Sequence, residues 1–475
     1  MIPLTATEIA QATNGIIYNK VTDDRLIDAV CTDSRNITAG CLFIALQGPL
    51  FDAHQFIEQA AKAGAAALLV HQKIDSKLPC ILVKDTRIAL GLLSAYVKRK
   101  IIGLKCAAIT GSNGKTTTKE FLSQILQLFS PAENSVLATA GNFNNDIGLP
   151  LTLLRLTAQS RFAVVELGAN HQGEIAYTAQ LAKPDVALIN NVMPAHLEGF
   201  GSIDGVAKAK GEIWGSLTAN GQAVVNLDAN FANEYLLQLQ QAKTNMITFS
   251  QSDTKAGVFA SQIRFDALGK AAFTLNIRQG SQLHTAAIHL QLAGKHNISN
   301  ALAAAAMATA LGCCIEVITR GLNVLTEVAG RVNRCQINEL VTVIDDTYNA
   351  NSASVKAAID LLVQTAGAHL LILADMAELG LYREQEHRDI GTYAAQQGIQ
   401  ALLTVGKATQ YTSQVFTEKS NNGARHFTDK KQLGTYLQNV LLQNSKKLSI
   451  LVKGSRSAKM EEIVTLIKQT LAAEV

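Results

Sequence analysis

Residues 110–117, TGSNGKTT, combine glycines, a lysine and hydroxyl groups in the pattern of a phosphate-binding loop. An apolar run precedes the loop at residues 106–109, and an amphipathic helix pattern follows it. A strand that turns through glycines into a helix directs backbone N–H groups and the positive helix end at one point, which suits phosphate. Ile109 stands where the usual pattern has its first glycine, so the loop is a shortened variant.

This loop predicts a nucleotide site in which different side chains have different roles. Lys115 would bind the outer phosphates, and the hydroxyl of Thr116 would bind Mg²⁺. The alternative is an ordinary helix-capping turn, which the combination of strand, glycines, lysine and hydroxyls disfavours. The predicted nucleotide-binding residues of the loop are Gly111, Ser112, Asn113, Gly114, Lys115, Thr116 and Thr117.

Two further apolar runs end in groups that could bind a metal ion. The run at residues 162–167 carries Glu166 at its end, and the run at 186–190 leads to His196. Parallel strands expose their carboxyl ends at the ligand edge of a sheet, so we expect Glu166 to hold the ion that Thr116 also contacts. Imidazole joins a Mg²⁺ or Mn²⁺ site when carboxylate or phosphate oxygens supply the other ligands. The alternatives are an exposed strand-end acid and a structural histidine.

Lys210 lies in a predicted helix at residues 206–213, close to these groups at the edge of the sheet. Its spacing alone is typical of a solvated helix face. A lysine beside bound cations and a triphosphate would be driven toward the neutral amine, the form that reacts with CO₂ to give a carbamate.

The remaining polar candidates lie at helix starts and strand ends. Asn297 and Asn300 are three residues apart at the start of an alanine-rich helix pattern, on one face. Arg331 lies at a predicted domain boundary, where it would contact a phosphate or a base, or else remain an ordinary surface arginine. The strand ends of the last domain carry Asp346, Tyr348, Asn349, Lys453, Ser455 and Arg456.

The spacing of apolar runs predicts an α/β protein of three domains, at residues 1–100, 101–328 and 329–475. Short runs at 41–46, 66–70 and 80–83 suit a small α/β first domain. The central domain alternates apolar runs with helix patterns, which indicates a mostly parallel sheet, and period-two alternation at 273–277 and 288–292 predicts a small antiparallel sheet. The last domain has a Rossmann-like pattern.

Composition excludes several classes of partner. The chain has 475 residues and a net charge of +4 from 42 basic and 38 acidic residues, without a basic arm, so no nucleic-acid partner is expected. Seven scattered cysteines suit reduced thiols rather than disulfides or zinc. The absence of a signal pattern or a membrane-length apolar run predicts a cytoplasmic protein without membrane insertion.

Together, these motifs resemble the Mur ligase family, the ATP-dependent amide-bond-forming enzymes that build the peptidoglycan precursor. The resemblance runs from end to end. It rests on residues 32–35 (TDSR), 48–56 (GPLFDAHQF), 110–117 (TGSNGKTT), 141–150 (GNFNNDIGLP), 166–175 (ELGANHQGEI), the His196 segment, 207–213 (AKAKGEI), 295–300 (KHNISN), 329–331 (AGR) and 345–351 (DDTYNAN).

The resemblance implies a role for each domain and each candidate residue. The first domain would bind the UDP-sugar, the middle domain ATP, and the third the incoming dipeptide. Catalysis would fall to Lys115, Glu166, His196, Lys210 and Arg331, with two Mg²⁺ ions held by Thr116, Glu166, His196 and carbamylated Lys210. The nucleotide would also contact Asn297, Asn300, Arg331 and Asp346. The predicted substrate residues are Ser34, Arg35, Asp52, His54, Asn142, Asn144, Asn145, Tyr348, Asn349, Lys453, Ser455 and Arg456.

The implied reaction activates the carboxylate of UDP-N-acetylmuramoyl-tripeptide as an acyl phosphate, which the amine of D-alanyl-D-alanine then attacks. We expect a monomer. The alternatives are another step of the same family, a folylpolyglutamate synthase-like ligase, and a nucleotide-dependent switch without amide chemistry. Residues 32–35 and 48–56 disfavour the folylpolyglutamate alternative because they precede the nucleotide module.

Overall fold

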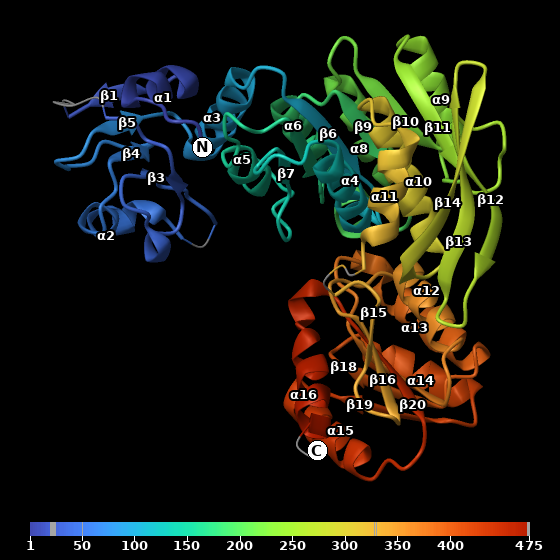
Figure 1. Ribbon diagram of the computed structural model, residues 1–475. Helices are drawn as coiled ribbons and strands as arrows, with labels where there is room; N and C mark the ends of the chain where they lie inside the picture. Colours follow the sequence, from blue (N-terminus) through green and yellow to red (C-terminus); the bar gives the residue numbers. More distant parts are fainter. Residues whose placement is uncertain (20–24, 50, 327, 329, 473–475) are drawn as a thin grey trace.

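The computed structural model describes residues 1–19, 25–49, 51–326, 328 and 330–472, which form three sheets in succession along the chain. Figure 1 shows the first part (blue) beside the central part and the last part (orange to red) below it. The predicted three-part α/β fold is confirmed. Residue 329, where the sequence analysis sets the second domain boundary, lies outside the described residues. Within those residues, the helices are all too short or too polar to cross a bilayer.

The N-terminal sheet has the strand order β1-β5-β4-β3-β2, with β1 antiparallel to β5 and the other neighbours parallel. Helix α3 joins this part to the next, and it lies so close to α6 (Glu174–Ala182) that a Cβ atom at Gly91 would be 2.3 Å from the hydroxyl of Tyr177. The elements are α1 (Ala6–Thr13), β1 (Ile16–Tyr18), β2 (Val30–Cys31), β3 (Leu42–Ile44), α2 (Ile57–Lys62), β4 (Ala67–Val70), β5 (Cys80–Leu82) and α3 (Thr86–Lys100).

The central sheet has the strand order β14-β13-β12-β11-β10-β9-β6-β8-β7. Strand β6 lies between β8 and β9, so the strands that follow it in sequence divide to its two sides, and such a switch point is where open parallel sheets bind ligands. The strands are β6 (Lys105–Thr110), β7 (Val136–Ala138), β8 (Phe162–Glu166), β9 (Val186–Ile189), β10 (Gln222–Asn226), β11 (Asn245–Ser250), β12 (Val258–Phe265), β13 (Lys270–Gln279) and β14 (Gln282–Ala293).

Two helices of the central part position the loop after β6. Helix α4 buries Phe121, Leu122 and Ile125, and it packs against the alanine-rich α10 in the same hydrophobic core. The helices are α4 (Lys115–Phe129), α5 (Gly148–Leu153), α6 (Glu174–Ala182), α7 (Leu197–Phe200), α8 (Ile203–Gly211), α9 (Ala232–Gln241), α10 (His296–Ala310) and α11 (Ile315–Val324). The predicted alternating strands are confirmed as β13 and β14, with Phe273 opposite Ile288.

The C-terminal sheet has the order β15-β16-β20-β17-β18-β19 and is parallel except for the edge strand β15. Its strands are β15 (Asn333–Gln336), β16 (Val341–Asp346), β17 (Ala368–Ala374), β18 (Ala401–Val405), β19 (Gly423–Phe427) and β20 (Leu448–Lys453). Its helices are α12 (Ser352–Leu362), α13 (Arg383–Gln396), α14 (Thr409–Lys419), α15 (Lys430–Leu442) and α16 (Glu461–Ala472). The predicted Rossmann-like pattern agrees with this parallel arrangement.

Candidate active site

The loop between β6 and α4 is held in a conformation that depends on glycine. Gly114 caps α4 with a φ of 78°, and a Cβ atom there would lie 2.3 Å from Oδ1 of Asn300. The ammonium group of Lys115 donates to the carbonyl oxygen of Gly111 at 2.6 Å. Burial lowers the pKa of Lys115 to about 8, although Glu166 opposes this shift. The lysine is therefore folded back over its own loop.

Two asparagines that follow β9 brace the loop, and the sequence analysis did not assign them a role. Asn190 Nδ2 donates to the carbonyl oxygen of Asn113 at 2.9 Å and to Oδ1 of Asn300 at 3.0 Å. The backbone N–H of Asn113 donates to Oδ1 of Asn191 at 2.9 Å. Both asparagines come directly after a parallel strand. The expectation that ligands bind at the carboxyl ends of parallel strands would therefore have identified them.

Glu166 and Thr116 form an oxygen-rich site beside the loop. The Thr116 hydroxyl donates to Oε2 of Glu166 at 3.2 Å, and Glu166 is only 1% exposed. Its Oε1 atom is buried and has no hydrogen-bond partner among the described residues, while Nζ of Lys119 lies 4.0 Å away. An orphaned buried carboxylate oxygen next to a hydroxyl fits Mg²⁺, which prefers oxygen ligands. The described residues contain no cluster of three or more His, Cys, Asp or Glu that would hold an ion alone.

Lys210 is buried near the end of α8, with 3% of its surface exposed. Burial, and secondarily the charge of Lys115, lowers its pKa well below the usual range. Helix α8 is braced from outside by Tyr235, whose hydroxyl donates to the carbonyl oxygen of Ala207 at 2.7 Å. Trp214, in the 3-10 turn Glu212–Ser216 that ends α8, packs edge-on against Tyr235 with ring centroids 6.2 Å apart. The predicted helix at 206–213 thus ends earlier, at Gly211.

His196 lies before α7 in a left-handed backbone conformation with a φ of 53°. Its Nδ1 atom contacts the carboxylate of Glu378, which comes from the loop after β17 in the C-terminal part. The hydrogen bond to His196 lowers the pKa of Glu378. Glu378 is not among the predicted site residues. Its partner is 182 residues away in sequence, so no local pattern could pair them.

Arg331 reaches Thr116, after the glycine-rich loop, from the segment that leads into the C-terminal part. Its Nη2 lies 3.4 Å from the Thr116 hydroxyl, and its Nε is buried without a hydrogen-bond partner among the described residues. The guanidinium group stacks 4.2 Å from the ring centroid of Tyr348. Arg456 lies 5.9 Å from the same centroid. Two cations thus flank a region in which a phosphate would be favourable.

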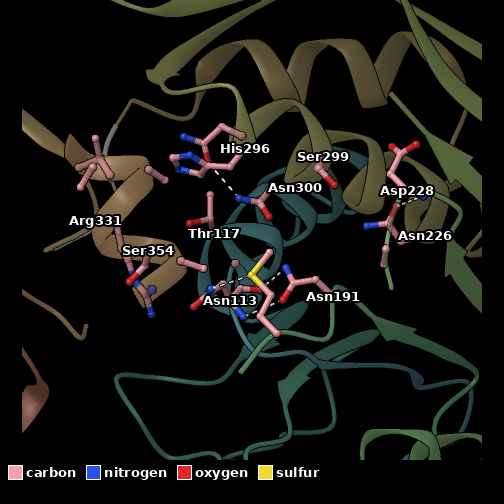
Figure 2. Close-up of a pocket in the computed structure, with 18 of the residues that line it drawn as sticks. Asn113, Thr117, Asn191, Asn226, Asp228, His296, Ser299, Asn300, Arg331 and Ser354 are labelled. Atoms are coloured by element: carbon pink, nitrogen blue, oxygen red, sulfur yellow. Dashed lines mark hydrogen bonds between the residues drawn. The ribbon is translucent and has the colours of Figure 1, made fainter. Parts of the chain in front are cut away.

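A cavity of about 320 Å³ opens on one side of the loop. Figure 2 shows it between Arg331 and Ser354 at one end and Asn226 and Asp228 at the other. Asn300 Nδ2 donates to Oδ1 of Asn297 at 3.0 Å within it. Of the predicted residues, it is lined by Asn113, Gly114, Thr117, Asn297, Asn300, Arg331, Asp346 and Lys453. Lys453, grouped by sequence with the dipeptide residues, therefore lies on this side.

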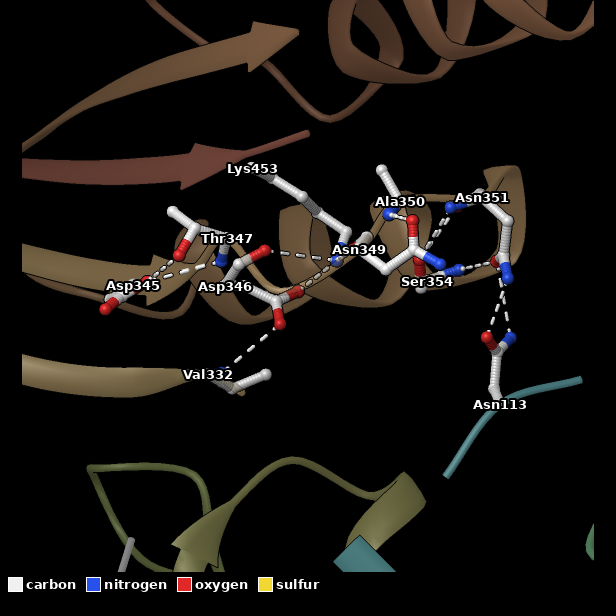
Figure 3. Close-up of polar contacts among 10 residues, drawn as sticks. All are labelled: Asn113, Val332, Asp345, Asp346, Thr347, Asn349, Ala350, Asn351, Ser354 and Lys453. Atoms are coloured by element: carbon white, nitrogen blue, oxygen red, sulfur yellow. Dashed lines mark hydrogen bonds and ion pairs between the residues drawn. The ribbon is translucent and has the colours of Figure 1, made fainter. Parts of the chain in front are cut away.

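The C-terminal part contributes a buried ion pair and a direct contact to the loop, both visible in Figure 3. The Lys453 ammonium pairs with the Asp346 carboxylate and donates to the carbonyl oxygen of Asn349 at 2.9 Å. Asn351 and Asn113 exchange amide hydrogen bonds of 2.6 and 3.3 Å. Asn351 also caps α12, because its side chain accepts from the backbone N–H of Ser354. The amide pair therefore ties α12 to the phosphate loop.

A second cavity of about 430 Å³ lies on the other side of the loop. It shares Asn113, Gly114, Arg331 and Ser354 with the first cavity, so the two meet at the loop. It also contains Glu378. The predicted residues that line it are Ser112, Lys115, Thr116, Asn142, Asn144, Asn145, Glu166, His196, Lys210, Tyr348, Asn349, Ser455 and Arg456.

The predicted residues of the N-terminal part line neither cavity. Arg35 pairs with Asp33 at 2.7 Å on the surface. His54 contacts Asp52 through Nδ1 at 2.6 Å and accepts a hydrogen bond from the backbone of His71 through Nε2 at 3.2 Å. In this conformation Ser34, Arg35, Asp52 and His54 are thus a separate group.

A glycine-rich loop at a sheet switch point, orphaned anionic and cationic groups around it, and two cavities that meet there define a nucleotide-dependent enzyme of three α/β parts. Three family models match the chain: Mur ligase family, catalytic domain, at residues 26–100; Mur ligase middle domain at 109–308; and Mur ligase, glutamate ligase domain, at 330–456. The chain belongs to the Mur ligase family, and it is an ATP-dependent amide-bond-forming ligase.

Individual relatives match over nearly the whole chain. The UDP-N-acetylmuramoyl-tripeptide–D-alanyl-D-alanine ligase of Escherichia coli (strain K12) is 44% identical over 469 residues, which cover 99% of each chain. A crystal structure of MurF from Acinetobacter baumannii superposes with a TM-score of 0.89 at 37% identity, covering 98% of this chain and 99% of that one. MurF ligase from Thermotoga maritima in complex with ADP gives a TM-score of 0.79 at 25% identity, covering 94% and 98%.

Proposed function

We propose that this chain joins D-alanyl-D-alanine to the terminal carboxylate of UDP-N-acetylmuramoyl-tripeptide, with ATP converted to ADP and phosphate. The observation that carries the proposal is the meeting of two cavities at one phosphate-binding loop. A reaction that passes a phosphoryl group from a nucleotide to a peptide acid needs this arrangement. Relatives with this activity in their names match the chain from end to end, which supports the choice of substrates.

The three domains would divide the substrates between them. We assign the UDP-sugar to residues 1–100, ATP to 101–328 and the dipeptide to 329–475. Ser34, Arg35, Asp52 and His54 would contact the UDP-sugar, and Asn142, Asn144 and Asn145 the tripeptide. Tyr348, Asn349, Ser455 and Arg456 would receive the dipeptide, with Lys453 acting through its ion pair with Asp346 on the nucleotide side.

The chemistry begins with the tripeptide carboxylate attacking the γ-phosphate of ATP. This forms an acyl phosphate and releases ADP. The dipeptide amine then attacks the activated carbonyl, and the tetrahedral intermediate expels phosphate. Lys115 and Arg331 would neutralise charge on the transferring phosphoryl group, which is the main contribution a protein makes to phosphoryl transfer.

Thr116 and Glu166 would hold one Mg²⁺, and His196 with a carbamate on Lys210 a second. When bound, the ions would supply charge neutralisation for phosphate oxygens. The orphaned Oε1 of Glu166 supports the first site. The burial and lowered pKa of Lys210 support the carbamate, because only the neutral amine reacts with CO₂.

The cellular setting follows from the substrates. We propose a cytoplasmic monomer, without nucleic-acid or membrane partners.

A phosphate-release assay tests the proposal. Release from ATP should require both a UDP-N-acetylmuramoyl-tripeptide and D-alanyl-D-alanine, and tripeptides ending in diaminopimelate and in lysine should be compared. Phosphate release without either substrate would instead indicate a nucleotide switch. Release that requires a folate and glutamate would indicate the folylpolyglutamate alternative.

A further inference from the structure

The loop after β17, in the C-terminal domain, places the side-chain carboxylate of Glu378 against the central domain. Glu378 has a left-handed φ of 62°, and Gly380 follows with a φ of 52°. A Cβ atom at Gly380 would lie 3.2 Å from the Cα atom of Glu198. The loop therefore packs closely against the segment that follows His196, and this packing sets the position of Glu378.

The carboxylate of Glu378 is the partner of one ring nitrogen of His196. It contacts Nδ1, which is buried and has no hydrogen-bond partner elsewhere in the described part of the chain. A neutral imidazole that donates through Nδ1 keeps its lone pair on Nε2. Histidines that bind metals generally use one nitrogen for the ion and direct the other N–H to a carboxylate or carbonyl.

We infer that Glu378 is a positioning residue for the metal site, holding His196 in the tautomer whose Nε2 can bind a cation. The inference rests on the proposed role of His196 as a metal ligand. Because Glu378 and His196 belong to different domains, the ligand set is fully oriented only when the C-terminal domain is docked. Docking of the C-terminal domain would therefore strengthen metal binding at His196. By thermodynamic linkage, a bound metal would strengthen docking by the same factor.

The surroundings of the pair favour this role over a simple surface ion pair. Both residues line the cavity that also contains Glu166 and Lys210. An exposed ion pair such as Arg388–Glu384, on α13 of the same domain, has no connection to that cavity. Glu384 therefore provides a matched control for removing one carboxylate charge.

The test is a Mn²⁺ titration of the full-length protein, followed by electron paramagnetic resonance in the presence of a non-hydrolysable ATP analogue and UDP-N-acetylmuramoyl-tripeptide. Glu378→Gln should weaken binding at one Mn²⁺ site by about 10- to 100-fold, as loss of a carboxylate behind a metal-bound histidine typically does. Glu378→Asp should recover part of the loss. Glu384→Gln should match the wild type.

Two outcomes would overturn the inference, and His196→Ala distinguishes them. If His196→Ala weakens Mn²⁺ binding but Glu378→Gln leaves it within twofold of wild type, the positioning role is wrong and the metal assignment stands. If neither variant changes the affinity, His196 is not a ligand and both assignments fail. As a second readout, ¹⁵N spectra of the imidazole should show His196 protonated on Nδ1 in the wild type and altered in Glu378→Gln.

Discussion

At the scale of single residues, the site depends on lysines that the fold partly or wholly removes from water. Lys210 is buried and Lys115 is half-buried near the phosphate loop, and the loss of surrounding water lowers the pKa of each ammonium group. Such groups are poised to interact with an anion or to react as neutral amines. Such desolvation costs stability, so we interpret these lysines as functional rather than structural.

Lys210→Ala should reduce turnover by about 100- to 1000-fold, the typical loss of a group that stabilises transition-state charge. The carbamate would be absent, so added bicarbonate should not restore the rate. Phosphate release measures the effect, and ¹³CO₂ labelling should give a carbamate resonance in the wild type only. Lys208→Ala is the control, because Lys208 is exposed on the same helix. A Lys210→Ala enzyme with near wild-type rate would rule out the carbamate.

The residues that give the site its chemistry could be predicted from the sequence, but several of the residues that contact them could not. Lys115, Thr116 and Glu166 belong to short motifs whose chemistry is local. The contacts of Glu378 with His196 and of Asn351 with Asn113 join residues far apart in sequence, and they arise only from domain packing. The proximity of Lys119 to Glu166 was also not predicted, because the position of Lys119 in α4 is that of an ordinary helix lysine.

At the scale of elements, the turn between β6 and α4 demands glycine. Gly114→Ala should destabilise the protein by more than the roughly 1–2 kcal/mol that a left-handed conformation costs an ordinary residue. The added methyl group would also displace Asn300 and Asn190, which meet at this point. The temperature of thermal unfolding and the affinity for an ATP analogue should both decrease.

Gly103→Ala isolates the backbone cost. Gly103 has a φ of 81° and open space where its Cβ atom would lie. It should lose stability but keep nucleotide affinity. Equal loss of affinity in both variants would mean that the fit around Gly114 is unimportant.

Helix α13 contributes a buried histidine that should make stability depend on pH. His387 accepts the backbone N–H of Met376 through Nε2 at 3.1 Å and donates through Nδ1 to the carbonyl oxygen of Arg383 at 2.7 Å. Burial lowers its pKa below the usual 6.5. The unfolded chain therefore binds the proton first, so the contribution is present above pH 6.5 and is lost as pH falls below it.

Denaturant unfolding measured from pH 7.5 to 5 checks this. In His387→Gln, the free energy of unfolding should fall less steeply toward low pH than in the wild type. In His289→Gln, which changes an exposed histidine on β14, it should fall as in the wild type. An unchanged pH profile in His387→Gln would show that the histidine is not held neutral in the fold.

Element types were predictable where the pattern was long. The strands β13 and β14 follow the period of two that a half-exposed sheet imposes, whereas the buried helix α10 was recognised from its run of alanines. The two-residue strand β2 and the edge strand β15 were not anticipated, because so few residues carry no period and their pairing is decided by neighbours.

At the scale of the whole molecule, the phosphate loop also serves as a contact between domains. The amide pair of Asn113 and Asn351 means that whatever occupies the loop can influence the docking of the C-terminal domain. Under the proposed assignment of substrates, three domains must converge on one reacting carboxylate. The separate position of the N-terminal residues then requires domain movement during the cycle.

Asn351→Asp should weaken this docking while keeping the cap of α12, because aspartate caps helices as well as asparagine does. The new carboxylate would face Oδ1 of Asn113 and lose a hydrogen bond, which contributes about 0.5–1.5 kcal/mol, or roughly a 2- to 12-fold rise in KM for ATP. Small-angle X-ray scattering should show a larger radius of gyration.

The reverse exchange at another cap provides the control. Asp429→Asn changes the cap of α15, far from the loop, and should leave KM and the scattering profile unchanged. If Asn351→Asp also leaves both unchanged, the amide pair does not contribute to docking.

Trp214 is the only tryptophan in the chain, and it packs beside the helix that carries Lys210. Excitation near 295 nm would therefore select one indole, whose emission responds to small changes in its surroundings. Any substrate that shifts α8 should alter the fluorescence without an added dye. The protein thus contains its own optical probe, with which stopped-flow mixing could time each binding step before chemistry begins.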